Sequence, residues 1–193
     1  MMKYYQEISL LHRADIGLYD FWQKLYQQIH LALVECKGES DKSTIGVSFP
    51  EYDATHFMLG CRLRLFAPEK SALEQLQCEK WLSRLKDYLH CGEIEPVPET
   101  IAEHACFCQV KPKGSKEKLA KRWAKRHGEE FEKALTYYDA YEEERSRLPY
   151  INMGSLTNGC HFRLFIEKRE KETAQAGVFS CYGLSPTTTV PLF

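Results

Sequence analysis

The chain has 193 residues, of which 44% are hydrophobic and 27% are charged, and its formal net charge is −1. These values are ordinary for a soluble globular protein, and the length suits one large domain or two small ones. No apolar run approaches the roughly 20 residues that a membrane-spanning helix needs, and the first residues lack the regions of a signal peptide. The composition therefore predicts a cytoplasmic protein that spans no membrane.

The first 110 residues alternate between the apolar period of strands and that of amphipathic helices. In chain order they predict a strand at 3–10, a helix at 18–36, strands at 43–50 and 56–66, a helix at 68–89 and a strand at 103–110. The order βαββαβ is that of the ferredoxin-like plan. We therefore predict an α+β fold whose N-terminal domain, residues 1–110, is ferredoxin-like. That plan hosts enzymes, regulators and RNA-binding proteins alike, so it does not decide the function.

Eight cysteines are scattered through apolar segments. The closest pair, Cys106 and Cys108, would point to one face of the last predicted strand, which a metal ion could exploit. No second pair follows with the spacing of a zinc site. We therefore expect reduced cysteines that act as small hydrophobic residues, and we expect neither a metal nor a cofactor.

A second, smaller domain is predicted over residues 111–193, and it begins with a turn-rich joint and a basic helix at 116–126. Ser115 stands where it can cap this helix. Eight lysine and arginine residues lie between positions 111 and 127, against the single acidic residue Glu117. Helical periodicity places five of these cations on one face, here called the cationic ridge: Lys118, Lys121, Arg122, Lys125 and Arg126.

The opposite face of this helix is apolar, so the helix can dock by that face and present the cationic ridge outward. The apolar face consists of Leu119, Ala120, Trp123 and Ala124. No acidic residue follows Glu117 on the helix to form ion pairs along it, and a polyphosphate would relieve the repulsion between the cations. Nucleic acid is therefore the favoured partner. A solvated face neutralised by the acidic segment 129–144, or an acidic protein partner, remains possible.

The remainder of the chain contains a polar turn at 154–160, an alternating strand at 161–169 and an apolar segment at 177–184. Four segments, IGVSFP at 45–50, HFRLFI at 161–166, CYGLS at 181–185 and the terminal VPLF, resemble the CRISPR-associated repeat-processing endoribonuclease of type I-F systems. Together with a histidine that ends the first helix and with the basic helix, they follow the family's order over nearly the whole chain.

The resemblance implies a ferredoxin-like domain joined to a smaller domain whose basic helix enters the major groove of a short RNA hairpin. It implies cleavage of CRISPR repeat RNA at the 3′ base of that hairpin without a metal ion. Attack by a 2′-hydroxyl would leave a cyclic phosphate. The enzyme would then stay bound to the mature guide RNA, together with the other subunits of the type I-F surveillance complex.

The resemblance also implies three catalytic residues. His30, which the apolar pattern alone would place in the core, matches the catalytic histidine, and an imidazole can transfer protons near neutral pH. Ser155, otherwise a turn residue, matches the serine that positions the 2′-hydroxyl. Tyr182, otherwise a buried aromatic residue, matches the tyrosine that helps to hold the histidine.

The implied RNA-binding residues depart in part from the family pattern. Phe162 matches the aromatic residue that stacks under the last base pair of the stem, and Thr157 replaces a second serine. Gln109 and Lys111 stand where members often place arginine and glutamine to read purines, so the preferred bases are expected to differ. The whole predicted set is Gln109, Lys111, Lys113, Lys118, Lys121, Arg122, Lys125, Arg126, Thr157, Phe162 and Arg163.

Two alternative hypotheses, which place the protein in other functional classes, stay open. One is a hairpin-RNA-binding subunit of a CRISPR ribonucleoprotein that has little or no cleavage activity. The other is a ferredoxin-like protein whose basic helix binds an acidic protein. Presence of all three matched catalytic positions favours the enzyme.

Overall fold

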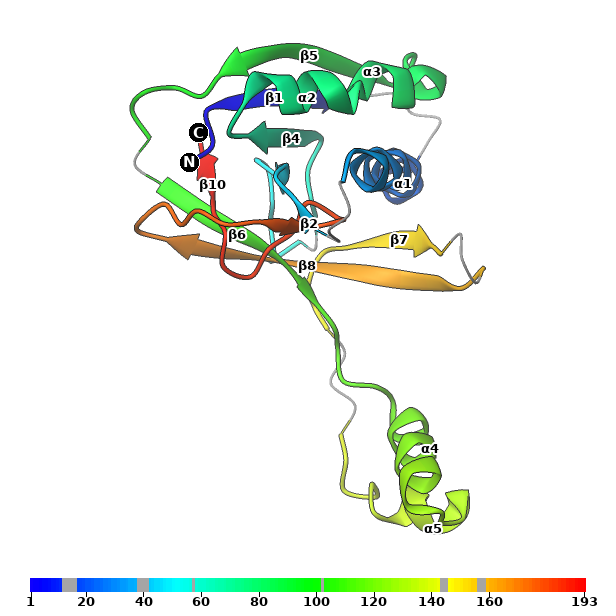
Figure 1. Ribbon diagram of the computed structural model, residues 1–193. Helices are drawn as coiled ribbons and strands as arrows, with labels where there is room; N and C mark the ends of the chain where they lie inside the picture. The colour runs from blue at the N-terminus through cyan, green and yellow to red at the C-terminus, as the bar shows by residue number, and fades with distance from the viewer. Residues whose placement is uncertain (12–16, 38–41, 57, 102, 143–145, 156–158) are drawn as a thin grey trace. The chain divides into compact units, whose positions relative to one another are not determined.

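The computed structural model describes residues 1–11, 17–37, 42–56, 58–101, 103–142, 146–155 and 159–193 (Figure 1). They form two compact units. Unit 1 contains residues 1–110 and 148–193, and unit 2 contains residues 111–147. The sequence-based division grouped residues 148–193 with the basic helix, whereas the compact units group them with residues 1–110. The fold of unit 1 is a mixture of helices and antiparallel sheets.

The first sheet of unit 1 has four strands in the order β3-β4-β1-β5, and every neighbouring pair is antiparallel. Its strands are β1 (Tyr4–Leu10), β3 (Gly46–Ser48), β4 (Arg62–Ala67) and β5 (Leu89–Pro96). Helices make the two crossover connections of this sheet. They are α1 (Leu18–Cys36), between β1 and β3, and then α2 (Lys70–Leu76), α3 (Cys78–Trp81) and a short 3-10 helix (Ser83–Leu85), between β4 and β5.

The second sheet has the order β10-β6-β8-β7, again with antiparallel neighbours. Its strands are β6 (Glu103–Val110), β7 (Tyr150–Gly154), β8 (His161–Lys171) and β10 (Val190–Leu192). A small pair, β2 (Lys42–Ser43) with β9 (Phe179–Ser180), completes the described strands. Within the second sheet Met153 faces Phe162 and Gly154 faces His161.

The strand predicted to close the first sheet was assigned to the wrong sheet. Residues 103–110 form β6, which pairs with β8 and β10, and the fourth strand of the first sheet is β5. The predicted helix 68–89 also ends early, because Gln77 adopts a left-handed conformation with φ of 49° after α2. The sequence pattern did not predict β5, because this strand contains a glycine, two glutamates and a proline, which all have low strand propensity.

Two other predicted strands are shorter than expected. The segment 43–50 divides between β2 and β3, which lie in different sheets. Within the segment 56–66, the described strand β4 begins at Arg62, because Gly60 just before it adopts a φ of 79°. A Cβ at Gly60 would lie 2.2 Å from the Cβ of Glu51, so this turn requires glycine.

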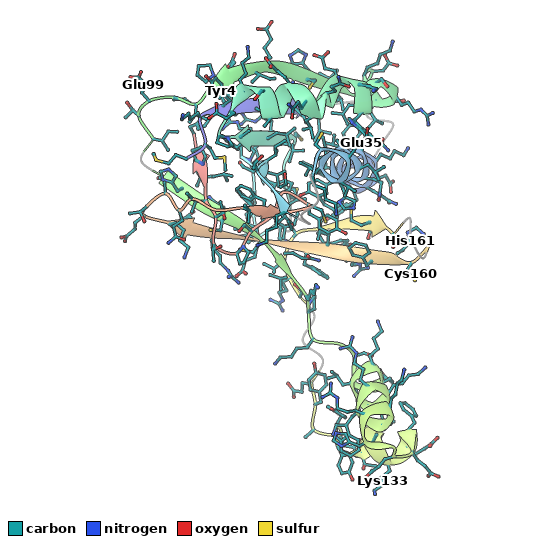
Figure 2. The ribbon with its side chains drawn as sticks, viewed as in Figure 1. Tyr4, Glu35, Glu99, Lys133, Cys160 and His161 are labelled. Atoms are coloured by element: carbon teal, nitrogen blue, oxygen red, sulfur yellow. The ribbon has the colours of Figure 1, made fainter. Side chains whose placement is uncertain are left out.

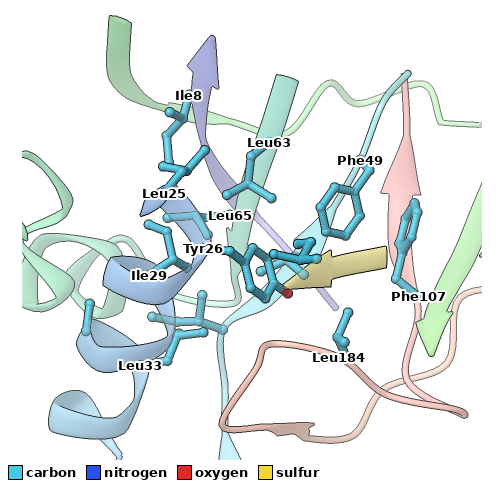
Figure 3. Packing of buried hydrophobic residues seen from close by; sticks show 14 of the residues in the cluster. Ile8, Leu25, Tyr26, Ile29, Leu33, Phe49, Leu63, Leu65, Phe107 and Leu184 are labelled. Carbon is cyan, nitrogen blue, oxygen red and sulfur yellow. The ribbon is translucent and has the colours of Figure 1, made fainter. Parts of the chain in front are cut away.

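The apolar stripe of α1 lies in the centre of the core. Leu25, Tyr26, Ile29 and Leu33 are completely buried, in one cluster with Ile8, Leu63 and Leu65 of the first sheet and with Phe107 and Met153 of the second (Figure 3). Figure 1 shows α1 end-on between the first sheet and β7. Each fully buried leucine or isoleucine contributes about 1.5–3 kcal/mol by the hydrophobic effect, so α1 is firmly held.

Unit 2 contains α4 (Lys116–His127) and α5 (Phe131–Thr136). The predicted helix and its cap are confirmed, because the side-chain oxygen of Ser115 accepts a hydrogen bond from the Lys118 backbone N–H at 3.4 Å. The apolar face of α4 packs inward: Ala120 and Ala124 form a small core with Ala134 of α5. In the described parts of both units, no helix combines the length and the apolar character needed to cross a membrane.

Candidate active site

His30 lies near the end of α1, half-buried, with Nδ1 2.9 Å from the carbonyl oxygen of Cys181. A carbonyl oxygen can only accept a hydrogen bond, so Nδ1 carries a proton and donates it. In the neutral imidazole the other ring nitrogen, Nε2, then has a lone pair. This assignment leaves Nε2 as the atom that can accept a proton from a substrate.

Tyr182 packs flat against the imidazole of His30. The two ring centroids are 4.2 Å apart and the ring planes differ by 10°. One turn earlier on α1, the hydroxyl of Tyr26 donates a 2.7 Å hydrogen bond to the backbone carbonyl of Tyr182. The segment 181–183 is therefore joined to α1 through its backbone at two consecutive residues, and the position of Tyr182 beside His30 is fixed.

A tight turn brings this segment to the helix. Gly183 has a φ of 70°, and a Cβ there would lie 2.6 Å from Cγ1 of Val47. Only glycine suits both the conformation and the close approach. The backbone N–H of Val47 donates to the carbonyl of Gly183 at 2.9 Å. The IGVSFP and CYGLS segments, far apart in the sequence, are thus in direct contact beside α1.

The environment of His30 favours its neutral form. Burial lowers the pKa of His30, the hydrogen bond to the Cys181 carbonyl raises it in part, and the charge of Lys37 lowers it again. Burial also raises the pKa of Tyr182, so its phenol stays protonated. At neutral pH the pair therefore consists of an uncharged base stacked on an uncharged phenol.

Ser155 follows β7 at the start of the turn that leads to β8. Its backbone N–H donates to the carbonyl of Cys160 at 2.8 Å, and its own carbonyl accepts from Gly159 at 2.9 Å. Figure 2 shows Cys160 and His161 at this end of the hairpin. The neighbouring residue Gly154 donates a backbone hydrogen bond to Oε1 of Gln27 on α1, at 3.2 Å. Thr157, predicted to bind RNA, lies outside the described residues.

Phe162 and Arg163 point to opposite faces of β8. The ring of Phe162 lies 6.5 Å from the ring of Tyr182 in an edge-on arrangement at 80°, which extends the row of rings that begins at His30. The guanidinium of Arg163 instead lies 4.7 Å above the ring of Tyr150, on the other face of the sheet. The structure therefore brings His30, Tyr182 and Phe162 together and places Arg163 elsewhere.

The predicted basic residues are exposed to solvent. Gln109 lies at the end of β6 in unit 1, whereas the lysines of the joint and the cationic ridge lie in unit 2. In the described part of unit 2, two acidic residues pair with cations outside the ridge: Asp139 with Lys116 at 2.5 Å, and Glu129 with Lys133 at 3.2 Å. Neutralisation of the cationic ridge by this acidic segment is therefore not seen among the described residues.

The described residues contain no group of three or more histidine, cysteine, aspartate or glutamate side chains arranged to hold a metal ion. Cys106 and Cys108 are both buried, and the thiol of Cys108 donates to the carbonyl of Ser185 at 3.4 Å. Sequence reasoning missed Tyr26 and Gln27. No motif marks either residue, and only the fold shows that each contacts the segments that carry the predicted catalytic residues.

Comparison with known proteins agrees with this arrangement of motifs. The family "CRISPR-associated protein (Cas_Csy4)" matches residues 5–193. Two proteins named CRISPR-associated endonuclease Cas6/Csy4, from Escherichia coli (strain UTI89 / UPEC) and Pseudomonas aeruginosa (strain UCBPP-PA14), are each 34% identical to the chain, with all of both chains covered.

Two solved structures align over nearly the whole chain. One is described as an RAMP protein binding different RNA substrates, with 11% identity, a TM-score of 0.37 and coverage of 98% of this chain and 100% of that one. The other, described as CRISPR associated protein Cas6, has 12% identity, a TM-score of 0.34 and coverage of 100% and 99%. From the full-length sequence matches, the chain belongs to the Cas6/Csy4 family of CRISPR-associated endonucleases.

Proposed function

We propose that this chain is a metal-independent endoribonuclease that cleaves CRISPR repeat RNA at the 3′ base of a hairpin and then stays bound to the mature guide RNA. Two relatives that match over their full length are named endonucleases. The observation that carries the proposal is the arrangement of His30, whose Nδ1–H is held by the Cys181 carbonyl and whose ring is stacked on Tyr182.

The chemistry follows from that arrangement. Nε2 of neutral His30 accepts the proton of the 2′-hydroxyl, and the 2′-oxygen attacks the adjacent phosphorus. The bond from phosphorus to the 5′-oxygen breaks, and that oxygen takes a proton from the imidazolium or from water. The products are a 2′,3′-cyclic phosphate and a 5′-hydroxyl. Ser155 positions the 2′-hydroxyl for in-line attack, and Tyr182 holds the imidazole.

Separate parts of the chain recognise the hairpin in this proposal. Phe162 stacks under the last base pair of the stem, next to Tyr182. The cationic ridge and the joint lysines bind the phosphates of the stem, and Gln109 and Lys111 contact purine edges near its base. A regular A-form major groove is too deep and narrow for side chains to read, so the ridge acts mainly through phosphate contacts.

Two wider statements belong to the same proposal. The strand order β3-β4-β1-β5, with α1 and α2 as crossovers, supports a ferredoxin-like frame for the first sheet. The retained product would make this chain one subunit of the type I-F surveillance complex. Retention of the product would follow if the cationic ridge supplies most of the affinity, because the ridge shares no residue with the proposed catalytic set.

The test is a single-turnover assay with the cognate repeat hairpin in EDTA. Wild type and a His90→Ala control, which changes an exposed histidine of β5, should cut once and leave a cyclic phosphate; His30→Ala should lose about 10²–10⁴-fold of the rate. A 2′-deoxy nucleotide at the cleavage site should block the reaction. Tight binding without cleavage by wild type would favour a hairpin-binding subunit, and undiminished cleavage by His30→Ala would reject the mechanism.

A further inference from the structure

Gln27 connects two of the three segments that carry the proposed catalytic residues, the helix of His30 and the strand end before Ser155. It lies three residues before His30 on α1, so the two side chains are on neighbouring parts of the helix surface, about 4.5 Å apart along the axis. Its Oε1 accepts the backbone N–H of Gly154 at 3.2 Å. Gly154 ends β7 and immediately precedes Ser155. Hydrogen bonding by one side chain therefore links the helix of His30 to the strand end that holds Ser155.

The other end of the Gln27 amide is buried. Nε2 has no hydrogen-bond partner in the structure, among the described residues. An unsatisfied buried donor is unfavourable for stability, so an apolar side chain of similar length would fit this place about as well. Stability alone does not account for a glutamine here. The glutamine is explained by its side-chain oxygen, a hydrogen-bond acceptor that reaches the backbone N–H of Gly154.

We propose that Gln27 is a positioning residue, which sets the separation between Ser155 and His30 through the Gly154 backbone. This inference rests on the proposed function. In the reaction, Ser155 orients the 2′-hydroxyl while His30 removes its proton, so both must reach the same oxygen. A displacement of about 1 Å between groups that must meet lowers a rate by as much as 100-fold. Without the Gln27 hydrogen bond, the hydrogen bonds that hold Ser155 among the described residues are those of its own backbone with Cys160 and Gly159.

The variant that isolates this role is Gln27→Met, which keeps the length of the side chain and removes both the acceptor and the unsatisfied donor. At saturating protein, we expect the single-turnover cleavage rate to fall about 10- to 100-fold. The dissociation constant for the hairpin should stay within about twofold, and the melting temperature within about 3 °C. The matched control is Gln28→Met, one position along α1 and about 100° away around its axis.

A second measurement asks whether Gln27 acts through Ser155. The double variant Gln27→Met with Ser155→Ala should cleave no more slowly than Ser155→Ala alone, because the positioned group is already gone. Multiplied losses would mean that Gln27 acts independently and would overturn the inference. So would a wild-type rate in Gln27→Met, or a loss confined to RNA affinity, or a collapse in melting temperature.

The hydrogen bond itself is tested without any activity. Amide exchange at Gly154 should be faster in Gln27→Met than in wild type or Gln28→Met. Failure of the proposed function gives a different pattern, in which His30→Ala cleaves as wild type does, whatever Gln27 contributes. A wild type that never cleaves would remove the positioning role together with the function, while Gly154 exchange would still report whether the two segments are tied.

Discussion

Tyr26 and His30, one turn apart on α1, hold two consecutive carbonyl groups of the same turn. The Tyr26 hydroxyl donates to the Tyr182 carbonyl at 2.7 Å, and His30 Nδ1 donates to the Cys181 carbonyl at 2.9 Å. Residues i and i+4 of a helix lie on one face, so a single helix can hold a short segment at two points. The orientation of the imidazole and the place of its stacking partner are therefore set by the same two contacts.

Tyr26→Phe should destabilise the protein. The variant keeps the completely buried ring and leaves the Tyr182 carbonyl without its donor, a loss of about 1–2 kcal/mol. Thermal unfolding should show a melting temperature lower by several degrees. Tyr137→Phe is the control, because Tyr137 is exposed on unit 2 and contacts Trp123 through its ring. Equal melting temperatures for wild type and Tyr26→Phe would contradict the prediction.

The phenol and the ring of Tyr182 should contribute differently. The contact with His30 is a stack of two rings, 4.2 Å apart, so Tyr182→Phe retains it. We expect Tyr182→Phe to cleave within about threefold of wild type, and Tyr182→Ala to lose about tenfold, the value of an aromatic contact of about 1.4 kcal/mol. Single-turnover assays at saturating protein measure both. An equally large loss in the phenylalanine variant would indicate that the hydroxyl takes part in the chemistry.

Protonation of His30 should occur at lower pH than in an exposed histidine. Burial favours the neutral form and lowers the pKa below 6.5, the ordinary value for histidine. The neutral form therefore predominates above pH 6.5, and any stability that depends on it is lost as the pH falls through the folded-state pKa. An NMR titration of the RNA-free protein, with the signal assigned by its loss in His30→Ala, should give a midpoint below 6.5.

Bound RNA should reverse part of this shift. Phosphate charge close to the imidazole favours the protonated form, so a hairpin with a 2′-deoxy nucleotide at the cleavage site should raise the pKa of His30. The same titration of the complex measures the change. A midpoint above 6.5 in the free protein, or no change on binding, would place His30 away from the scissile phosphate or in a different hydrogen-bonding state.

The cationic ridge should govern affinity and leave the chemical step unchanged. We expect weaker hairpin binding and unaltered single-turnover cleavage at saturating protein when four ridge residues become alanine, namely Lys121, Arg122, Lys125 and Arg126. The slope of log K against log salt concentration should become shallower by about 3.6, which is roughly 0.9 for each of the four lost phosphate contacts. Lys133→Ala is the control, since Lys133 is paired with Glu129. An unchanged salt dependence would favour a protein partner for the ridge.

The sequence predicted elements best where local chemistry alone decides them. The first helix was expected at 18–36 and occupies those residues, because its apolar stripe is long and regular. The basic helix was recognisable from its cap at Ser115 and from its two distinct faces. The pairing of the strands was not predicted correctly. Residues 103–110 pair with β8 and β10, and their own sequence does not indicate this, because register and partner depend on distant segments.

In the candidate site too, what the local sequence indicates differs from what depends on distant contacts. His30, Ser155 and Tyr182 were chosen by resemblance, and their proposed roles stay predictions. The contacts that surround them could not be predicted from the sequence. Tyr26 looks like any other residue of the apolar stripe of α1, and Gln27 looks like any other polar residue beside that stripe. Their hydrogen bonds join α1 to residues more than 120 positions away. Periodicity describes which face of a helix is buried, and it does not describe the polar partners found there.

Unit 2 is an insertion between β6 and β7 of unit 1, and its small core of Ala120, Ala124 and Ala134 shares no residue with the large core around α1. Each core is therefore built from its own set of described residues, and we expect the effects of substitutions in the two cores to be additive. Under the proposed function, a repeat sequence that drifts over generations can be followed in part by changes in the inserted segment, while Gln109 and Phe162 belong to unit 1. The RNA-binding residues of unit 2 can therefore evolve at a different rate from the proposed catalytic residues of unit 1.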